Sequence, residues 1–444
     1  MAVVPLALRR APLDVLATLA REPGAFLLEV PDDTRPFVIL GCAPVAELRV
    51  PDGAGGDALA AIERFVAETP LVDPALPFPL GGGVVGCLGY ELGRLIEPPR
   101  DGIVCGGDLP LALLRRYDPL LAYDRSREQY TLLCSDPRAA RAPWLERLAA
   151  PAPSWDGPLG GPLAPLLAPA RYREAVARIL GYLAAGDVYQ VNLTQPFTAP
   201  LVAPAWALAA QLGRQHPVPY GAYLDLGSTQ VVANSPELFL RRRGRRVETR
   251  PIKGTRPRGD GPSDDAALAA ELLRDPKERA EHVMIVDLER NDFGRVCEVG
   301  TVAVERHAVI ESHPTVHHLV STVTGRLRLE VGLADLLRAT FPGGSITGAP
   351  KVRAMEIIRE LEPWPRGPYT GAFGFLDPRG DLELGLAIRT AIVTGGTVRY
   401  HAGGGIVADS DTERELAEAW LKTAALRRAL GEEPRRGLEL CSSG

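Results

Sequence analysis

Short apolar runs separated by turn signals characterise residues 1–147, with AFLLEV (25–30), FVILG (37–41) and the glycine-rich GGGVVGCLGYELG (81–93) as the clearest examples. None of these runs has the spacing of a catalytic motif. Residues 148–169 are rich in proline and glycine, which predicts a segment that crosses between two parts of the molecule. We therefore expect an N-terminal part (1–147), a larger part (170–432) and a short tail (433–444).

Helical and strand periods follow one another after this crossing. Tyr172, Val176, Ile179 and Leu183 recur at helical spacing, and Gly186 stands where a C-terminal cap belongs. The next segment, YQVNLTQPF (189–197), alternates and predicts a strand. Its polar side, with Gln190, Asn192 and Thr194, is either the wet face of a sheet or the floor of a pocket.

An arginine-rich hairpin is predicted over 238–249, with its turn at Gly244. It carries Glu237 into one strand and delivers Lys253 just after the other. Pro251 and Gly254 flank this lysine, so we expect its backbone to be held by special dihedral angles and not by a helix or a ladder. Burial or nearby positive charge would favour a neutral, nucleophilic lysine, with Glu237 moving the proton. The alternative is an ordinary solvated hairpin with a surface lysine.

Two helices each carry a glutamate on an apolar face. Asp275, Pro276 and Glu278 predict a capped helix start, and Glu281 shares a face with Met284, Ile285 and Leu288. Ser410 and Glu413 predict a capping box for a helix running to Gly431, in which Glu418 shares a side with Leu421 and Ala425. Two inward carboxylates suit a hard cation such as Mg²⁺. The alternative is a pair of acids that reach solvent from their helices.

Two glycine-rich segments are candidates for anion binding. FPGGSITGAPK (341–351) opens a helix, but Ala349 and Pro350 separate Lys351 from the last glycine, which excludes a nucleoside triphosphatase loop. AGGGIV (402–407) follows a strand and offers a second set of bare amides, and Arg389 could grip a carboxylate. Together these elements predict a small substrate with two negative charges.

The composition is that of a globular protein, with 46% apolar and 24% charged residues among 444 and a net charge of −5. This balance argues against binding to nucleic acids or membranes. The six cysteines are scattered without a CxxC pair, and there is no secretory signal or bilayer-length apolar run. We expect a soluble, cytoplasmic protein.

Taken together, these motifs resemble those of the chorismate-utilising enzymes, which include the anthranilate, aminodeoxychorismate, isochorismate and salicylate synthases. The resemblance covers about residues 170–430 and rests on seven segments in order: GDVYQVNLTQPF, SPEL, PIKGTRPRG, EHVMIVDLERNDFGRV, VHHLVSTVTG, FPGGSITGAPKVRAMEII and AGGGIVADS. It implies an α+β fold of stacked antiparallel sheets forming a sandwich, with helices outside and the active site in a cleft. It also makes 170–432 the part that binds chorismate, and assigns structural or regulatory roles to 1–147.

The resemblance implies a role for each candidate residue. Lys253 would attack chorismate as a nucleophile, with Glu237 as the acid and His318 near the departing hydroxyl. Glu281 and Glu418 would hold Mg²⁺ against the ring carboxylate. The implied chorismate-binding residues are Gly254, Thr255, Tyr369, Arg389, Gly403, Gly404 and Gly405. A structural role remains the competing interpretation for the histidines, more so for His317 than for His318.

Two positions distinguish the branches of this family. Anthranilate synthases usually have alanine in place of Lys253, and the water-adding branches typically have lysine in place of Gln190. The likeness is therefore closest to the aminodeoxychorismate synthases, which add ammonia to chorismate on the route to 4-aminobenzoate and folate. No glutaminase motif is present, so we expect a separate glutaminase subunit. Val30 stands where tryptophan-binding relatives have serine, although Pro219 and Tyr220 match, which puts tryptophan binding in doubt.

Overall fold

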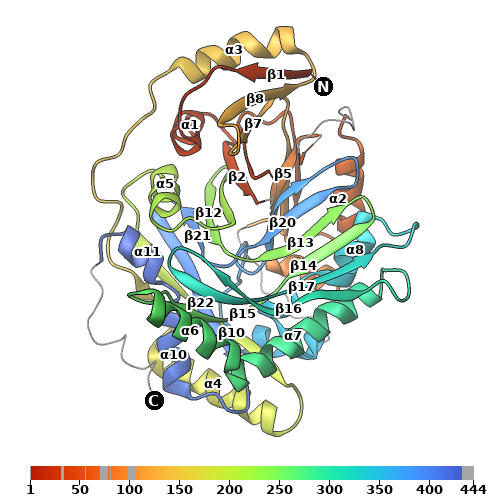
Figure 1. The fold of residues 1–444 in the computed structure, drawn as a ribbon, viewed down its shortest axis with the longest axis vertical. Helices are drawn as coiled ribbons and strands as arrows, with labels where there is room; N and C mark the ends of the chain where they lie inside the picture. Colours follow the sequence, from red (N-terminus) through yellow and green to blue (C-terminus); the bar gives the residue numbers. More distant parts are fainter. Residues whose placement is uncertain are drawn as a thin grey trace.

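Two large antiparallel sheets form the centre of the molecule (Figure 1). The computed structural model describes residues 2–31, 35–55, 57–70, 79–80, 82–98, 107 and 109–432. Within these ranges the first sheet has 12 strands; eleven follow in the order β1 (Ala2–Leu6), β8 (Gln129–Cys134), β7 (Leu120–Asp124), β3 (Phe37–Gly41), β2 (Phe26–Val30), β11 (Tyr220–Asp225), β12 (Thr229–Ser235), β21 (Thr390–Thr394), β22 (Thr397–Ile406), β10 (Gln190–Pro200) and β18 (Gly348–Ala349). The twelfth, β9 (Ala164–Pro165), pairs with β10.

The second sheet has 10 strands among the same residues. Nine follow in the order β15 (Ile252–Pro257), β17 (Val316–Arg326), β14 (Arg246–Arg250), β13 (Leu238–Arg243), β20 (Leu382–Leu386), β19 (Ala372–Leu376), β5 (Val84–Leu88), β6 (Ala112–Arg116) and β4 (Ala46–Val50). The tenth, β16 (Ala303–Ser312), pairs with β17. Every one of these described pairings is antiparallel, as is each pairing of the first sheet.

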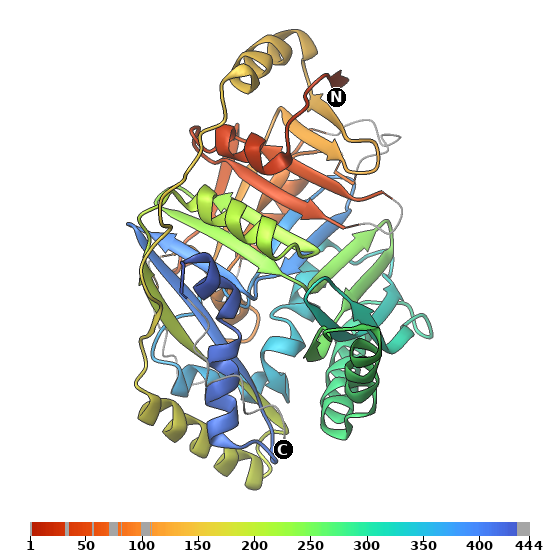
Figure 2. The ribbon, with the colours of Figure 1, turned by 60° about the vertical axis from the view of Figure 1, so that its left-hand side comes forward.

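Helices cover the outer faces of the two sheets (Figures 1 and 2). The described helices are α1 (Pro12–Leu19), α2 (Ala58–Ala67), α3 (Pro137–Ala149), α4 (Pro169–Ala184), α5 (Ala205–Gln215), α6 (Pro262–Arg274), α7 (Pro276–Gly294), α8 (Leu333–Thr340), α9 (Lys351–Leu361), α10 (Thr412–Leu421) and α11 (Ala424–Ala429), with 3₁₀ turns η1 (Tyr90–Leu95) and η2 (Gly344–Ile346). In Figure 2, α4 and α10 stand apart from α6 and α7 at the lower end of the molecule.

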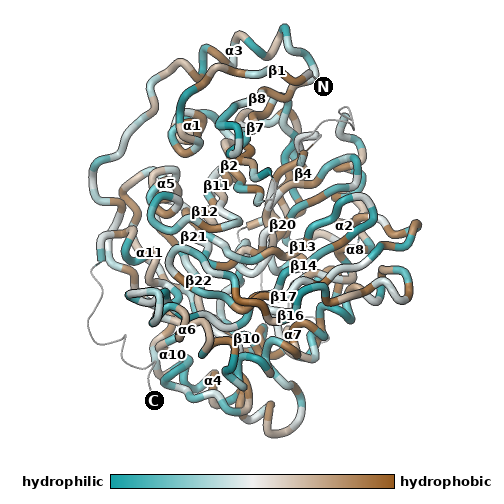
Figure 3. The backbone as a smooth tube through the Cα atoms, viewed as in Figure 1, coloured by the Kyte–Doolittle hydropathy of each residue, from teal (hydrophilic) through white to brown (hydrophobic). Residues whose placement is uncertain are grey.

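Alternation along the strands explains why the two sheets stack. On β2, Phe26, Leu28 and Val30 point into the core between the sheets, whereas Leu27 points to the helices α1 and α5. Successive side chains of a strand lie on opposite faces, so a strand with apolar residues on both faces must be covered on both sides. Figure 3 shows that apolar and polar residues alternate along many of the strands. The sandwich with outer helices expected from the resemblance is confirmed.

Strands from both sides of the proline-rich segment pair with one another. Phe26–Leu28 of β2 lie opposite 222–224 of β11, and β5 lies opposite β19. The chain over 150–163 has no helix or named strand, and Figure 2 shows it running down one side from α3 to α4. The functional division at about residue 147 stays a prediction, and the tail over 433–444 lies outside the described residues.

Local signals placed several elements correctly. The helix α4 ends before Gly186, which has a φ of +80°, and Asp275 caps α7 by accepting hydrogen bonds from the backbone N–H groups of Lys277 and Glu278. The predicted capping box of the last helix is wrong: Asp411 is the N-cap, and the Ser410 hydroxyl donates to Glu415 instead. That helix also ends at Leu421, and α11 begins only at Ala424.

Candidate active site

Lys253 and Glu237 meet at Ser345. The Lys253 ammonium donates a hydrogen bond to the Ser345 carbonyl oxygen at 3.2 Å, and the Ser345 hydroxyl donates to Glu237 Oε1 at 2.7 Å. Ser345 belongs to η2, in the glycine-rich loop, whereas the two other residues flank the hairpin β13–β14. The fold therefore joins the predicted nucleophile and the predicted acid through a residue that sequence analysis did not select.

The backbone of Lys253 lies in a strand, contrary to the prediction. Lys253 pairs with Leu319 in the ladder between β15 and β17, and the register shifts directly after it, at Gly254. Gly254 has a φ of +79°, and a Cβ atom there would lie 2.7 Å from the Leu272 side chain. The ladder holds the lysine in place, and the irregular backbone is the bulge that follows it.

Glu237 is buried in an environment that suits proton transfer. Only 5% of the residue is exposed, and burial raises its pKa to about 7. The Ser345 hydroxyl, the Lys253 ammonium and a backbone hydrogen bond from Ile252 oppose this shift. At neutral pH both forms of the carboxyl group are therefore populated, as general acid–base catalysis requires.

A second buried carboxyl group, Glu289, lies within electrostatic range of Glu237. Burial raises its pKa to about 8; the nearby Asp292 adds to the rise and Lys351 opposes it. Sequence analysis missed Glu289, although it follows Glu281 and Ile285 at intervals of four along α7. The buried face of α7 carries His282, Ile285, Val286, Glu289, Asp292 and Phe293, so Ile285 is buried as expected, whereas Met284 and Leu288 are only partly buried.

His318 is held next to Gly254 and Thr255. Its Nδ1 atom lies 3.0 Å from the Thr255 hydroxyl, and the ring also bonds the Gly254 backbone. Burial, with His313 and Arg389 nearby, lowers the pKa of His318 to about 3, so the ring is neutral at physiological pH. His317 is satisfied structurally, because Ser312 lies 2.8 Å from Nδ1 and Asp265 lies 2.9 Å from Nε2.

Glu281 and Glu418 reach the same region from opposite helices. The Glu281 side chain is 15% exposed, and burial raises its pKa to about 7; Glu418 adds to that rise, and Lys253 opposes it. The Glu418 side chain is 47% exposed, and Leu421 on the same side of α10 is exposed too, so the prediction of an inward apolar side is wrong. Burial alone would raise the pKa of Glu418. The ammonium group of Lys422, 2.5 Å away, and more weakly that of Lys253, outweigh burial and hold this pKa below its usual value.

Glu281 and Glu418 could supply part of the ligand set of a hard cation. Among the residues that the structure describes, no group of three or more His, Cys, Asp or Glu side chains is assembled for a metal. Mg²⁺ needs only one or two protein carboxylates, because it keeps waters or substrate oxygens as its other ligands. Burial raises the pKa of Glu281, and a cation bound beside it would favour its ionised form.

The residues expected to bind the substrate adjoin this region from β22 and from two strained turns. Thr370, directly after Tyr369, and Arg389 both have positive φ values, +59° and +51°, which non-glycine residues adopt at a cost of about 1–3 kcal/mol. Gly403–Gly405 belong to β22 and pair with β10 on one side. On the other side, the pairing of β22 with β21 ends at Tyr400, before these glycines. A Cβ atom on Gly404 would lie 3.2 Å from Glu418 Oε1. A larger side chain at position 404 would therefore displace the Glu418 carboxylate.

Comparison with known proteins agrees with these features. A family model described as chorismate binding enzyme matches residues 24–428. The chain is 42% identical over 431 residues to anthranilate synthase component 1 of Thermus thermophilus, covering 92% of this chain and 93% of that protein. It is 44% identical over 353 residues to aminodeoxychorismate synthase component 1 of Klebsiella aerogenes, covering 80% and 78%. The crystal structure of anthranilate synthase component I from Streptococcus pneumoniae matches with a TM-score of 0.77 at 32% identity, over 88% and 93%.

The chain belongs to the chorismate-binding enzyme family. Within this chorismate-binding enzyme, Gln190 lies on the buried face of β10 and is completely buried. Its side-chain amide has no hydrogen-bond partner in the described structure and packs against Gly405. The polar side of β10 is therefore not the wet face of a sheet. An unpaired buried amide is costly, so a small polar molecule is expected beside it.

The glycine-rich loop before α9 packs into the fold, and the anion site expected at the helix start stays a prediction. Residues 341–349 are all buried, and Gly348–Ala349 pair with β10 as β18. Lys351, at the beginning of α9, contacts Asp292 at 2.5 Å. In this enzyme the loop presents Ser345 to Lys253 and Glu237.

Acidic residues neutralise the arginine-rich hairpin and its flanks. Seven of the eight arginines between 241 and 258 form ion pairs, for example Arg241 and Arg243 with Glu383 and Arg246 with Glu305. They form no continuous unpaired basic surface of the kind that binds phosphates. None of the helices in the described ranges is long and apolar enough to span a membrane.

Proposed function

We propose that this chain is the aminating component of an aminodeoxychorismate synthase, which converts chorismate and ammonia to 4-amino-4-deoxychorismate. The contact of Lys253 with Ser345, which also binds Glu237, carries this proposal. An alanine at position 253 would have no nucleophilic group, whereas a lysine amine beside a buried carboxyl group supports a covalent route. The relative from Klebsiella aerogenes, 44% identical, supports the same assignment.

The first half of the reaction forms a covalent adduct. Lys253 gives its ammonium proton to solvent, its free amine attacks C2 of chorismate, both double bonds of the ring shift, and the C4–O bond breaks as Glu237 gives its proton to the departing hydroxyl. Water leaves, and C2 is bonded to the lysine nitrogen. Glu237 suits this step because its pKa of about 7 allows it to carry the proton at neutral pH. The neutral His318 ring, as the family resemblance implies, lies near the leaving group.

The second half exchanges the lysine for ammonia. Ammonia attacks C4, both double bonds of the ring shift back, and the C2–N bond to Lys253 breaks with its electrons returning to the lysine nitrogen. The extra proton of the new ammonium group restores the acid form of Glu237. The unpaired amide of Gln190 is a candidate contact for the incoming amine, because it offers both a donor and an acceptor in a buried site. Two successive displacements let ammonia enter on the face that the hydroxyl left.

Glu281 and Glu418 would hold Mg²⁺ in this scheme. The cation would supply charge stabilisation for the ring carboxylate of chorismate. Glu281 contributes from α7 and Glu418 from α10, with Lys422 restraining Glu418 in the free protein. Arg389 and the amides of Gly403–Gly405 would orient the carboxylates of the substrate.

A second candidate is anthranilate synthase component 1, which converts chorismate and ammonia to anthranilate and pyruvate. It is favoured by the similarity to the Thermus thermophilus protein, which extends over 92% of this chain. The two functions differ in whether pyruvate is released. The assay is therefore the purified chain with chorismate, ammonium and Mg²⁺, followed by chromatography of the products and a pyruvate measurement. Aminodeoxychorismate without pyruvate supports the first function, and anthranilate with an equal amount of pyruvate supports the second.

The chain alone is expected to use ammonium but not glutamine. Cys42, Cys87, Cys134 and Cys297 are all buried, and burial raises the pKa of Cys87 to about 12, so none of them is an activated thiolate. We predict turnover with ammonium chloride and none with glutamine at equal nitrogen concentration. The supply of ammonia is assigned to a separate glutaminase subunit. Steady amination from glutamine by the purified chain would contradict this.

The pH dependence of turnover is expected to report Glu237. Its acid form is required and its pKa is about 7, so at a fixed concentration of free ammonia the rate should fall as the pH rises above that value. Glu237→Gln should lower turnover about 10²–10⁴-fold and remove this decline. Saturating Mg²⁺ in the assay keeps Glu281 ionised, so that it does not add a second decline. A wild-type decline that persists in the glutamine variant would assign the titration to another group.

A further inference from the structure

Arg366 lies in the connection between α9 and β19 and is 1% exposed. A guanidinium group has five N–H donors, and all five are used. They bond Glu362 Oε2 at 2.7 Å, Glu362 Oε1 at 2.6 Å, the Asn192 carbonyl oxygen at 2.8 Å, the Ile346 carbonyl oxygen at 3.0 Å and the Thr370 hydroxyl at 3.3 Å. No role in substrate binding explains a fully buried and fully bonded arginine.

The three acceptors other than Glu362 each belong to a segment that carries part of the active site. Ile346 directly follows Ser345, which contacts both Lys253 and Glu237. Asn192 lies in β10 two residues after Gln190, and Thr370 directly follows Tyr369. One planar group thus fixes the distances between three segments that are remote in sequence.

Glu362 extends this arrangement. Its Oε1 atom also accepts hydrogen bonds from the backbone N–H and the hydroxyl of Thr194, at 2.8 and 3.0 Å. The arginine–glutamate pair is therefore bound to β10 twice, through Asn192 and through Thr194. Removing the guanidinium would leave Glu362 charged and without its partner in the interior, which is unfavourable.

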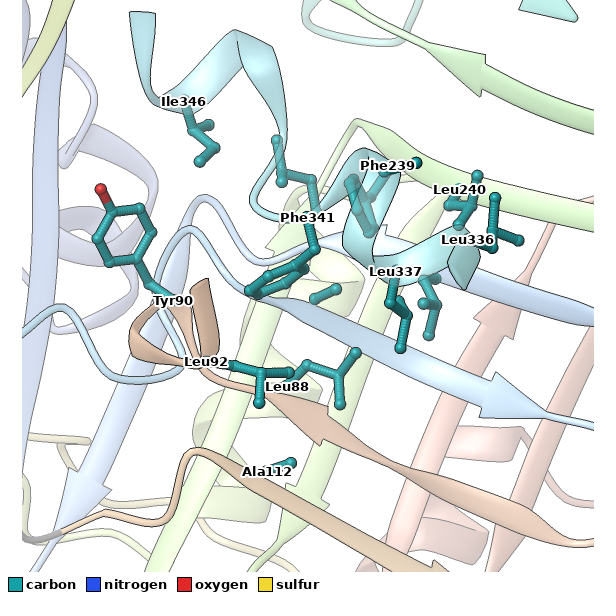
Figure 4. Close-up of a cluster of buried hydrophobic side chains, with 14 of the residues drawn as sticks. Leu88, Tyr90, Leu92, Ala112, Phe239, Leu240, Leu336, Leu337, Phe341 and Ile346 are labelled. Carbon is teal, nitrogen blue, oxygen red and sulfur yellow. The ribbon is translucent and has the colours of Figure 1, made fainter. Parts of the chain in front are cut away.

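The N-terminal part of the chain supports the same arginine. The Tyr90 ring lies beneath the guanidinium at 4.6 Å, and Glu91 accepts hydrogen bonds from the backbone N–H groups of Arg366 at 2.8 Å and Gly367 at 2.9 Å. Figure 4 shows Tyr90 at the edge of an apolar cluster with Phe341 and Ile346, with its hydroxyl directed away from Phe341. The contacts that hold Arg366 therefore come from both parts of the chain.

We infer that Arg366 is a positioning residue for the amination reaction: it fixes the turn that carries Ser345, and with it the relative placement of Lys253 and Glu237. The inference rests on the proposed function. Lysine cannot replace it, because one ammonium group cannot bond Glu362 at both oxygens and also reach the carbonyl groups of Asn192 and Ile346. A displacement of about 1 Å at reacting groups can cost about 10²-fold in rate.

The test compares Arg366→Lys with Arg115→Lys. Arg115 is also a buried arginine, 8% exposed, and it bonds Glu47 at 2.8 Å in the N-terminal part. Chorismate consumption with ammonium and Mg²⁺ is measured as kcat and KM over a range of pH, well below each variant's melting temperature. For Arg366→Lys we expect kcat to fall about 10²-fold with a smaller change in KM. The high-pH decline should also move to higher pH, because the Ser345 hydroxyl, whose hydrogen bond lowers the pKa of Glu237, is no longer held in place.

Arg115→Lys should lower the melting temperature and leave kcat and the pH profile at the wild-type values. The inference is overturned if Arg366→Lys is folded and behaves in the same way. If Arg366→Lys does not fold, Tyr90→Leu and Tyr90→Phe replace it. Tyr90→Leu, which removes the ring, should lower kcat and move the high-pH decline of turnover to higher pH. Tyr90→Phe keeps the ring under the guanidinium and should match the wild type. The inference is also overturned if Tyr90→Leu and Tyr90→Phe have the same kcat and the same pH profile.

The proposed function and this inference can fail separately. Product analysis of the wild type decides between aminodeoxychorismate and anthranilate before any variant is made. The effect of Arg366→Lys is read from chorismate consumption, which both reactions share.

Discussion

Lys253→Arg is expected to lose at least about 10³-fold of the rate of chorismate amination while the fold and the positive charge remain. The physical reason is that a guanidinium group stays protonated and cannot attack C2, whereas the lysine amine can. If Lys253 acted only by attracting the carboxylates of chorismate, arginine would substitute well. Turnover is measured with ammonium and saturating Mg²⁺, and circular dichroism and thermal unfolding confirm that the variant is folded.

Lys277→Arg provides the matched control. Lys277 is half exposed on α7 and lies 4.0 Å from Glu281, so it adds positive charge near the same region without contacting Ser345. Its arginine variant should keep nearly wild-type turnover. Chorismate given to the wild type without any amine should also leave an adduct, of the mass of chorismate less one water, on the peptide that contains Lys253. Near-normal turnover of Lys253→Arg together with no adduct in the wild type would refute the covalent role.

Local sequence signals placed several elements correctly but did not identify the contacts between them. The hairpin around Gly244, the cap at Asp275 and the end of α4 depend on neighbouring residues, and each was predicted. Ser345 was not, because its two roles come from a backbone carbonyl and a hydroxyl that meet residues about a hundred positions away. No periodicity along the loop marks such a residue.

The faces of the helices show a related limit. On α10, Glu418 was assigned to an inward side because Leu421 and Ala425 share its spacing. The helix ends at Leu421, however, and Ala425 belongs to α11, so this periodicity joins two different helices. Glu418 reaches the site in spite of this, because α10 packs on β22, where Gly404 leaves room for the carboxylate. The structure does not support the reason for which Glu418 was selected, and its role as a metal ligand stays a prediction.

Glu281→Gln and Glu418→Gln are expected to weaken Mg²⁺ binding and turnover more than any change outside the covalent site. Loss of a residue that only supports a metal ligand commonly costs 10–100-fold in affinity, so loss of a ligand should cost at least about that much. The midpoint of the Mg²⁺ dependence of turnover should rise accordingly. A second measurement avoids catalysis: Mg²⁺ together with chorismate should raise the melting temperature of the wild type, and raise it much less in either variant.

The same variants separate a metal site from a structural carboxylate. Without Mg²⁺, Glu281→Gln should be as stable as the wild type or more stable above pH 7, because burial raises the pKa of Glu281 and the fold must hold a poorly compensated charge there. A carboxylate that served only the fold would instead lower the free energy of unfolding when it is replaced. Glu413→Gln is the control on α10, since Glu413 is exposed and bonds only Arg173 among its described side-chain partners. Glu413→Gln should change neither the midpoint of the Mg²⁺ dependence of turnover nor the melting temperature. Unchanged Mg²⁺ dependence in both Glu281→Gln and Glu418→Gln, or full activity in EDTA, would remove these residues from the metal site.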